Sequence, residues 1–173
     1  AIYDDGEYGD ILLNGDIHTA NQNAAGLPSR DMAKTFIYGF LYGAGDEKVG
    51  SIVGKGKKEG ARLKREFLKK TPALDKLRKA VRQSALRGYL IGLDKRKMPV
   101  RSEHAALNTL LQGCGAIICK RWVVEFHKLL KEHGYKQQKD YWQAAFVHDE
   151  VQVIVREEIG DDIGRLCIEA IKR

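Results

Sequence analysis

Residues 30–43 read RDMAKTFIYGFLYG, and this stretch decides how the rest of the chain can be arranged around it. Two cationic and two aromatic residues recur at every fourth position. On a helix with about 100° per residue, they form one slowly drifting stripe: Arg30, Lys34, Tyr38 and Tyr42. The apolar residues between them fall on the neighbouring face, where they can pack against a core: Ala33, Phe36, Ile37, Phe40 and Leu41. With Ser29 as N-cap and Gly43 as terminator, the sequence predicts a helix from Arg30 to Tyr42.

The stripe has side chains suited to a nucleoside triphosphate. Arg30 and Lys34 can hold phosphate oxygens, Arg as a two-pronged donor and Lys as a point charge. Tyr38 and Tyr42 offer flat surfaces for a sugar or a base. Periodicity alone favours a simpler interpretation, an amphipathic surface helix whose tyrosines are half buried.

Outward from this helix, the remaining signals predict an α+β fold, mostly helical with antiparallel hairpins. Capping residues, glycines, prolines and apolar periodicity delimit the expected elements. One short helix is expected within 10–26, and longer helices are expected at 57–70, 72–87, 103–133 and 157–173. Hairpins are expected at 89–100 and at 144–155, the second with a tight turn at His148-Asp149.

The tip of the second hairpin carries three polar residues, His148, Asp149 and Glu150, between apolar strands. Adjacent carboxylates at such a turn can share hard cations such as Mg²⁺, which prefers oxygen ligands. The alternative is an ordinary polar turn, in which Asp is common. Two-metal chemistry needs a second acidic residue on another strand. Asp4 and Asp5 lie in a polar, glycine-containing segment rather than at a strand end.

A polar stripe also marks the long helix, where His104, Asn108 and Gln112 recur every fourth residue. Amide and imidazole groups suit the acceptors of the DNA minor groove, which are similar for every base pair. A polar face turned toward solvent explains the same pattern, and from this pattern alone it is the better interpretation.

The net charge of +7 is distributed unevenly along the 173 residues. Residues 1–29 contain five acidic residues and no Lys or Arg, whereas residues 55–101 contain 17 Lys or Arg against four acidic residues. Such a cationic block is typical of a solvated helix face, or of a surface that binds a polyanion by releasing its counterions.

No apolar run approaches the roughly 20 residues of a membrane-spanning helix, and the first residues lack the features of a signal peptide. The three cysteines, Cys114, Cys119 and Cys167, show no paired metal-ligand spacing. We therefore expect reduced thiols in a cytoplasm and no membrane partner. Because the chain does not begin with Met, we expect a fragment or a processed product.

Residues 30–43 resemble the fingers helix of family A DNA polymerases, in the branch of the short-tailed bacteriophages. Three further motifs match that branch in the same order: Asp16-Ile17-His18-Thr19, residues 105–112 (AALNTLLQ) and Val147-His148-Asp149-Glu150. The resemblance covers nearly the whole chain. It implies a nucleotidyltransferase of DNA replication, with a right-hand polymerase fold.

The resemblance implies a binding site for a deoxynucleoside triphosphate. His18, Arg30 and Lys34 would contact the triphosphate, and Lys34 would also be a candidate to protonate the leaving pyrophosphate. Tyr38 would lie at the sugar and influence discrimination against 3′-modified nucleotides. Tyr42 would stack near the nascent base pair and exclude 2′-hydroxyls.

The resemblance also implies contacts with primer–template DNA and two Mg²⁺ ions. Asp149 would bind the catalytic metals with support from Glu150, and His148 would lie near the primer terminus. The cationic segment 55–101 would hold phosphates of the duplex and template. The minor groove would be lined by His104, where many relatives have Arg, and by Asn108 and Gln112.

In terms of architecture, the resemblance implies fingers at about 18–87 and part of the palm at about 88–173. The family's first metal-binding aspartate lies upstream of the segment that begins here, so we expect the isolated chain to be inactive. The thumb and any proofreading exonuclease are expected outside it, as is the binding site of a processivity factor. The host-cell cytoplasm is the expected location.

Three functions therefore compete. The first is template-directed DNA synthesis by two-metal catalysis. The second is a single-subunit RNA polymerase, which shares the spacing of Arg30, Lys34 and Tyr42 but typically has a small residue at the position of Glu150. The third is a non-catalytic module that grips primer–template or nucleotide without turnover.

Overall fold

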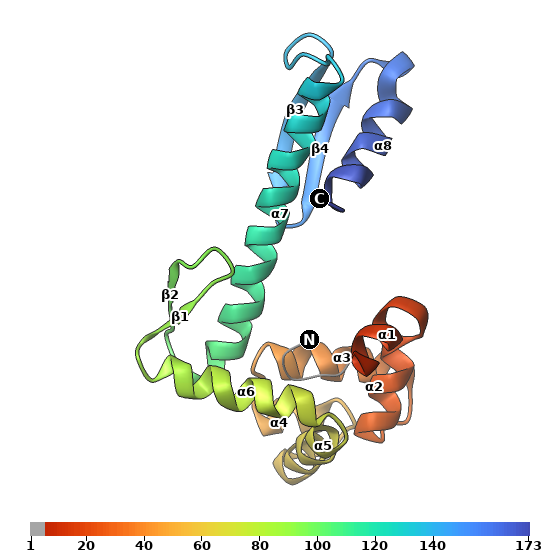
Figure 1. Cartoon of the computed structure of the whole chain (residues 1–173). Helices are drawn as coiled ribbons and strands as arrows, with labels where there is room; N and C mark the ends of the chain where they lie inside the picture. Colours follow the sequence, from red (N-terminus) through yellow and green to blue (C-terminus); the bar gives the residue numbers. More distant parts are fainter. Residues whose placement is uncertain (1–5) are drawn as a thin grey trace. The chain divides into compact units, whose positions relative to one another are not determined.

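The computed structural model describes residues 6–173 (Figure 1). These residues form two compact units. The first unit comprises the described residues up to Ile91 together with Lys97–Leu110. The second comprises Gly92–Arg96 and Leu111–Arg173. The long helix α7 (Ala106–Glu132) begins in the first unit and ends in the second. Each unit has a hydrophobic core of its own.

The first unit is built mainly from the helices that precede α7. Their bounds are α1 (Glu7–Asn14), α2 (Ile17–Ala25), α3 (Arg30–Leu41), α4 (Asp46–Ser51), α5 (Lys57–Lys70) and α6 (Pro72–Ala85). An antiparallel hairpin and a 3₁₀ helix then lead into α7: β1 (Tyr89–Ile91), β2 (Lys97–Pro99) and η1 (Glu103–Ala105).

Helix α3 forms where its capping signals predict it. The Ser29 hydroxyl accepts a hydrogen bond from the Met32 backbone N–H at 3.2 Å, the bond expected of an N-cap serine. Phe36 and Phe40 are buried, and Phe67 of α5 meets their rings edge-on at centroid distances of 5.2 and 5.4 Å. These three aromatic side chains determine which side of α3 faces outward.

Two glycines allow α4 and the segment after it to lie directly against α5. A Cβ atom on Gly60 would lie 1.7 Å from the carbonyl oxygen of Asp46, and one on Gly50 would lie 2.1 Å from that of Gly56. Close-packed atoms cannot approach so closely, so these positions accept only glycine. Lys64 of α5 adds an ion pair to Asp46 at 2.9 Å.

A second apolar cluster in the first unit joins α6, the β1–β2 hairpin and the start of α7. Its buried members are Val81, Ala85, Leu90, Met98, Ala106 and Leu107. The hairpin pairs Tyr89 with Pro99 and Ile91 with Lys97. The burial of Leu90 and Met98 leaves the charged residues of the hairpin exposed.

The second unit packs a hairpin and a helix around the rest of α7. Its elements are β3 (Tyr141–Val147), β4 (Glu150–Val155), the 3₁₀ helix η2 (Glu157–Ile159) and α8 (Gly160–Ala170). The strands are antiparallel from Tyr141↔Val155 to Val147↔Glu150, with an irregularity between Gln143 and Ala145. The buried side chains come from α7, β3 and α8: Phe126, Leu129, Leu130, Tyr141, Ile163, Leu166 and Ala170.

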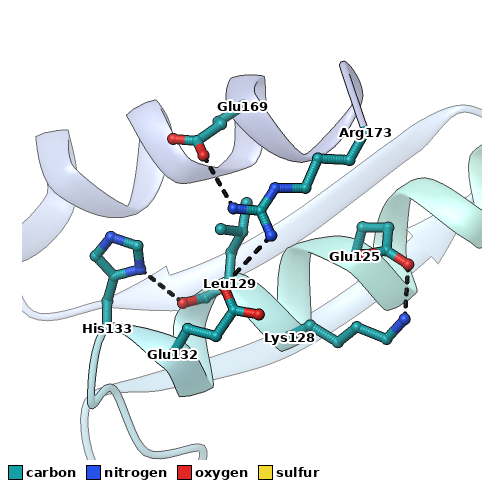
Figure 2. A network of polar contacts seen from close by, with 7 residues as sticks. All are labelled: Glu125, Lys128, Leu129, Glu132, His133, Glu169 and Arg173. Atoms are coloured by element: carbon teal, nitrogen blue, oxygen red, sulfur yellow. Dashed lines mark hydrogen bonds and ion pairs between the residues drawn. The ribbon is translucent and has the colours of Figure 1, made fainter.

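Polar contacts at the surface add to this core (Figure 2). Arg173 donates to Glu132 of α7 at 3.3 Å and to Glu169 of α8 at 3.2 Å, so it links the two helices. Lys128 pairs with Glu125 at 2.7 Å within α7. Such exposed pairs contribute little to stability individually, and the apolar core is the main stabilising term.

The predicted α+β class is confirmed, as are the helix at 57–70 and both hairpins. The helix predicted at 72–87 is present but ends at Ala85. The prediction of one short helix within 10–26 is wrong, because Gly15 is extended and Asp16 caps a new helix. The last α-helix begins only at Gly160, after the 3₁₀ turn η2. Within residues 6–173, no helix has the length and apolar character needed to cross a membrane.

We predict that Gly60→Ala lowers the free energy of unfolding by about 3 kcal/mol, the upper end of what overpacking costs. The reason is the 1.7 Å that would separate the new Cβ from the Asp46 carbonyl oxygen. Chemical denaturation of the chain measures the change. Gly9→Ala is the control, since a Cβ at this helical position meets nothing within 4 Å. An unchanged stability of Gly60→Ala would contradict the close packing of α4 and α5.

Candidate functional site

The outward face of α3 presents the predicted stripe. Arg30 and Lys34 are exposed, while Tyr38 and Tyr42 are 45% and 54% exposed. The two tyrosine rings lie nearly parallel, with centroids 6.3 Å apart and planes 20° apart. The helix ends at Leu41, one residue before the predicted end, and Tyr42 is its C-cap residue. The stripe therefore offers two cations followed by two accessible aromatic faces.

Asp16 links the start of α2 to the start of α3. Its carboxylate accepts two hydrogen bonds from the Arg30 guanidinium, from Nε at 2.7 Å and from Nη2 at 3.2 Å. It also accepts from the His18 backbone N–H at 3.0 Å and from the Thr19 hydroxyl at 2.8 Å. These donors, Arg30 first, hold the pKa of Asp16 well below its usual range. In the sequence, Asp16 stands out only as part of a motif, although Asp before a helix start is an N-cap signal.

His18 of α2 lies beside the stripe of α3. Its ring centroid is 6.5 Å from that of Tyr38, at a tilt of 55°. The His18 Nδ1 atom is buried and has no hydrogen-bond partner among the described residues. The structure thus brings together His18, Arg30 and Tyr38 from α2 and α3, three of the residues that the resemblance assigns to the triphosphate site.

A pocket of about 480 Å³ lies beside the C-terminal end of α3. Phe40 and Leu41 form part of its wall. Its cationic lining residues are Lys64, Arg78 and Arg82, and its acidic ones are Asp46 and Glu103. The net positive lining would favour an anionic group.

Arg78 is a partly buried cation of this pocket. Burial lowers the pKa of its guanidinium, because the charged form loses water. Its Nε atom is buried without a hydrogen-bond partner among the described residues, and its contact with Asp75 is long, at 3.8 Å. In the sequence, Arg78 is only one residue of the cationic block 55–101, because its burial comes from tertiary packing.

His104 stands at the edge of the same pocket, in η1 rather than in the α-helix predicted for it. Its Nδ1 atom lies 3.4 Å from the Arg82 guanidinium. Gly43 approaches its backbone closely, since a Cβ there would lie 2.7 Å from the His104 carbonyl oxygen. Gly43 also has a positive φ of 79°, which glycine adopts without strain.

The other two residues of the predicted polar stripe lie on α7. Asn108 is half buried in the first unit, and its Oδ1 atom has no hydrogen-bond partner among the described residues. Gln112 is exposed and belongs to the second unit. Each offers side-chain amide groups to a ligand.

The β3–β4 hairpin carries His148, Asp149 and Glu150 at its tip, where the sequence predicted a tight turn. His148 and Asp149 form the two-residue turn, and Glu150 pairs with Val147 at the start of β4. All three polar residues are exposed, and Glu150 accepts a hydrogen bond from the Gln152 amide at 2.7 Å.

Two adjacent carboxylates at this turn are available as hard oxygen ligands. In the part of the chain that the structure describes, no three His, Cys, Asp or Glu residues gather as a metal cluster. Asp4 and Asp5, weighed in the sequence analysis as a second acidic anchor, lie outside the described residues.

The fold resembles that of a known polymerase domain. A solved structure titled "POL domain of Pol1 from M. smegmatis complex with DNA primer-template and dNTP" superposes with a TM-score of 0.80 over 97% of this chain and 33% of the other. The two sequences are 21% identical, so this likeness concerns the fold alone.

The chain belongs to DNA polymerase family A, whose family model matches residues 13–173. It is 50% identical to the DNA-directed DNA polymerase of Enterobacteria phage T3 over 99% of its own length and 27% of that protein. The corresponding polymerase of Escherichia phage T7 is 50% identical over 98% of this chain and 26% of the relative. DNA polymerase I of Bacillus caldotenax is 26% identical over 88% of this chain and 18% of the relative.

The resemblance to the phage branch of this family is thereby confirmed. The chain spans about a quarter of the length of the phage relatives. The predicted division into fingers and palm, and the role of each site residue, stay predictions.

We predict that His148→Val destabilises the second unit by about 1–2 kcal/mol, the cost of forcing a β-branched residue into a left-handed conformation. His148 has a φ of 57° at the turn. His148→Gly is the matched control and is expected to retain the stability of the parent chain. Thermal unfolding followed by the near-ultraviolet signal of Trp122 and Trp142, which lie on α7 and β3 in the second unit, measures both. Equal stability of the two variants would contradict the turn geometry.

Proposed function

We propose that this chain is part of a template-directed DNA polymerase, which transfers deoxynucleotides to a primer 3′-hydroxyl. The observation that carries the proposal is the outward stripe of α3 with His18 beside it, in a member of DNA polymerase family A. In this proposal, residues of about 18–87 act as the fingers and residues of about 88–173 as part of the palm.

The triphosphate would bind at the start of the stripe. Arg30 and Lys34 are exposed one turn apart, so their cationic groups can reach neighbouring phosphates. His18, on α2, would donate from its ring to a phosphate oxygen. Its ring centroid lies 6.5 Å from that of Tyr38, which supports a place for His18 beside the stripe.

The nucleoside would lie along the aromatic end of the stripe. Tyr38 would contact the sugar and influence discrimination against 3′-modified nucleotides. Tyr42 would stack near the nascent base pair and exclude 2′-hydroxyls. The near-parallel rings, 6.3 Å apart and about half exposed, support this assignment because they offer flat surfaces to a ligand.

Asp149 and Glu150 would hold Mg²⁺, with His148 near the primer terminus. Mg²⁺ is commonly bound by one or two carboxylates and completes its shell with water and phosphate oxygens, so two exposed neighbouring carboxylates fit it. When bound, two such ions stabilise negative charge on the attacking and leaving oxygens.

Primer–template DNA would be held by two kinds of contact. The cationic helices α5 and α6 would bind phosphates of the duplex and template by electrostatic attraction. His104, Asn108 and Gln112 would each donate to acceptors of the minor groove, which do not depend on sequence. A processivity factor would bind outside these residues.

The proposed reaction joins the primer 3′-oxygen to the α-phosphorus of the triphosphate. The bond from that phosphorus to its bridging oxygen breaks, and pyrophosphate leaves with the electron pair. Lys34 would donate a proton to the leaving pyrophosphate, while the hydroxyl proton passes to water. Arg30 and His18 would hold the leaving group in place.

Two other functions make different predictions. A non-catalytic module would bind primer–template or nucleotide without turnover, and the pair of carboxylates without a third ligand in the described residues favours it as the second candidate. A single-subunit RNA polymerase is disfavoured by Glu150 and by the phage relatives, which are named DNA-directed DNA polymerases.

We predict that Asp149→Asn slows primer extension by about 1,000-fold, because metal ligation is worth several kcal/mol in the transition state. The assay uses a chimera in which this chain replaces the matching segment of the phage T7 relative. Asp161→Asn, a change at another exposed carboxylate of the second unit, is the control and should leave the rate within about twofold.

An active chimera whose Asp149→Asn variant retains its rate would contradict the metal assignment. A chimera that binds primer–template with normal affinity but extends no primer would favour the non-catalytic module.

We predict that Lys34→Ala in the same chimera lowers kcat by about 100-fold, the lower range for loss of a proton donor. It should also raise KM for the deoxynucleotide, because a phosphate contact is lost. Lys48→Ala removes another exposed lysine of the first unit and serves as the control. Unchanged kcat together with raised KM would assign Lys34 to binding alone.

A further inference from the structure

One carboxylate in the first unit contacts residues of both helices that would bind the triphosphate. Asp16 accepts from Arg30 at the start of α3 and from the backbone N–H of His18 in the first turn of α2. Arg30 and Asp16 are 14 residues apart in sequence. Through these hydrogen bonds, Asp16 links the position of Arg30 to that of the His18 backbone.

The geometry of the Arg30 contact leaves donors free for a second anion. A guanidinium has five N–H groups in a planar fork. Asp16 occupies the edge formed by Nε and Nη2, so the N–H groups of Nη1 face elsewhere. Arg30 can thus keep its contact with Asp16 while it binds a phosphate oxygen.

Asp16 has a second function as the N-cap of α2. Its side chain accepts the His18 N–H, a donor that has no partner within the helix. This bond fixes the first turn of α2 and with it the backbone of His18. The same carboxylate thus contacts the side chain of Arg30 and the backbone of His18, which lie on different helices.

We propose that Asp16 is a positioning residue for the triphosphate: it holds Arg30 and His18 in the arrangement that the phosphates require before the nucleotide arrives. This inference rests on the proposed function of Arg30 and His18. A long arginine side chain loses rotamer freedom when it binds, and the bidentate contact removes part of that freedom in advance.

Repulsion between the Asp16 carboxylate and the phosphates acts against binding. Four hydrogen-bond donors surround this carboxylate, and its side chain is 42% exposed, so donors and water both screen its charge. The triphosphate also carries Mg²⁺, which reduces its net charge. We therefore expect positioning to outweigh repulsion.

Asp16→Asn separates the two functions of the side chain. Asn caps a helix about as well as Asp, so α2 should keep its first turn, whereas the ionic contact with Arg30 is lost. Thr19→Val is the matched control, because it removes a different hydrogen bond to the same carboxylate and leaves the Arg30 contact in place.

The test is titration of the 173-residue chain with dTTP and, separately, with tripolyphosphate, both with Mg²⁺. Nuclear magnetic resonance follows the backbone amides of α2 and α3 and the Arg30 Nε–H signal. We expect Asp16→Asn to bind both probes about fivefold more weakly, within the usual coupling between contacting residues. Thr19→Val should bind as the parent chain does.

A double-substitution cycle with Arg30→Ala shows whether Asp16 acts through Arg30. In the Arg30→Ala background, Asp16→Asn should cause no further loss of affinity. An equal fivefold loss in that background would overturn the proposal, because it would reflect a general effect on structure. Unchanged or tighter binding by Asp16→Asn alone would overturn it too.

The same titration distinguishes failure of the proposed triphosphate site from failure of the positioning role of Asp16. If the parent chain binds neither probe, the proposed triphosphate site is wrong and this inference falls with it. If the parent chain binds and Arg30→Ala weakens binding while Asp16→Asn does not, only the positioning role of Asp16 is wrong.

Discussion

The burial of Phe36 and Phe40 against Phe67 is the contact on which the site of the first unit depends. Each such ring removes roughly 150–250 Å² from water, so α3 has one strongly preferred orientation. Because successive residues on a helix are rotated by about 100°, sinking these two rings leaves Lys34 and Tyr38 on the accessible side. A rotation of α3 would bury a lysine ammonium and expose aromatic rings, and both changes are unfavourable.

Orientation alone does not place the stripe, so both ends of α3 are also fixed. At the start, Ser29 caps the helix and Asp16 holds Arg30. At the end, Gly43 comes so close to the His104 backbone that no side chain would fit between them. A cationic or aromatic stripe on a frayed helix would have to be ordered by the ligand, at a cost in affinity. Here the protein orders it beforehand.

The sequence was sufficient where local signals decide the structure. Ser29 before the helix, Pro72 at a helix start and the alternation of residues 150–155 predicted elements that the structure contains. Features that depend on tertiary contacts could not be predicted from the sequence. The pairing of Asp16 with Arg30, the burial of Arg78 and the 3₁₀ geometry at His104 arise when distant segments meet, and no periodicity encodes them. The resemblance named the residues of the candidate site, whereas the hydrogen bonds that Asp16 accepts from Arg30 and His18 could not be read from it.

The candidate cationic and acidic side chains belong to different compact units, each with its own hydrophobic core. Arg30 and Lys34 are oriented by the aromatic core of the first unit. Asp149 is positioned by the β3–β4 hairpin, which packs against the core of the second unit. Opposite charges held side by side by one core pair with each other, as Lys64 and Asp46 do at 2.9 Å. In the proposed function, the cations of the stripe bind phosphates and the carboxylates of the hairpin bind metal ions, so different cores would allow each set to be shaped for its own ligand. A substitution in either core should then disturb one set without the other, since residues that share no contacts usually act independently.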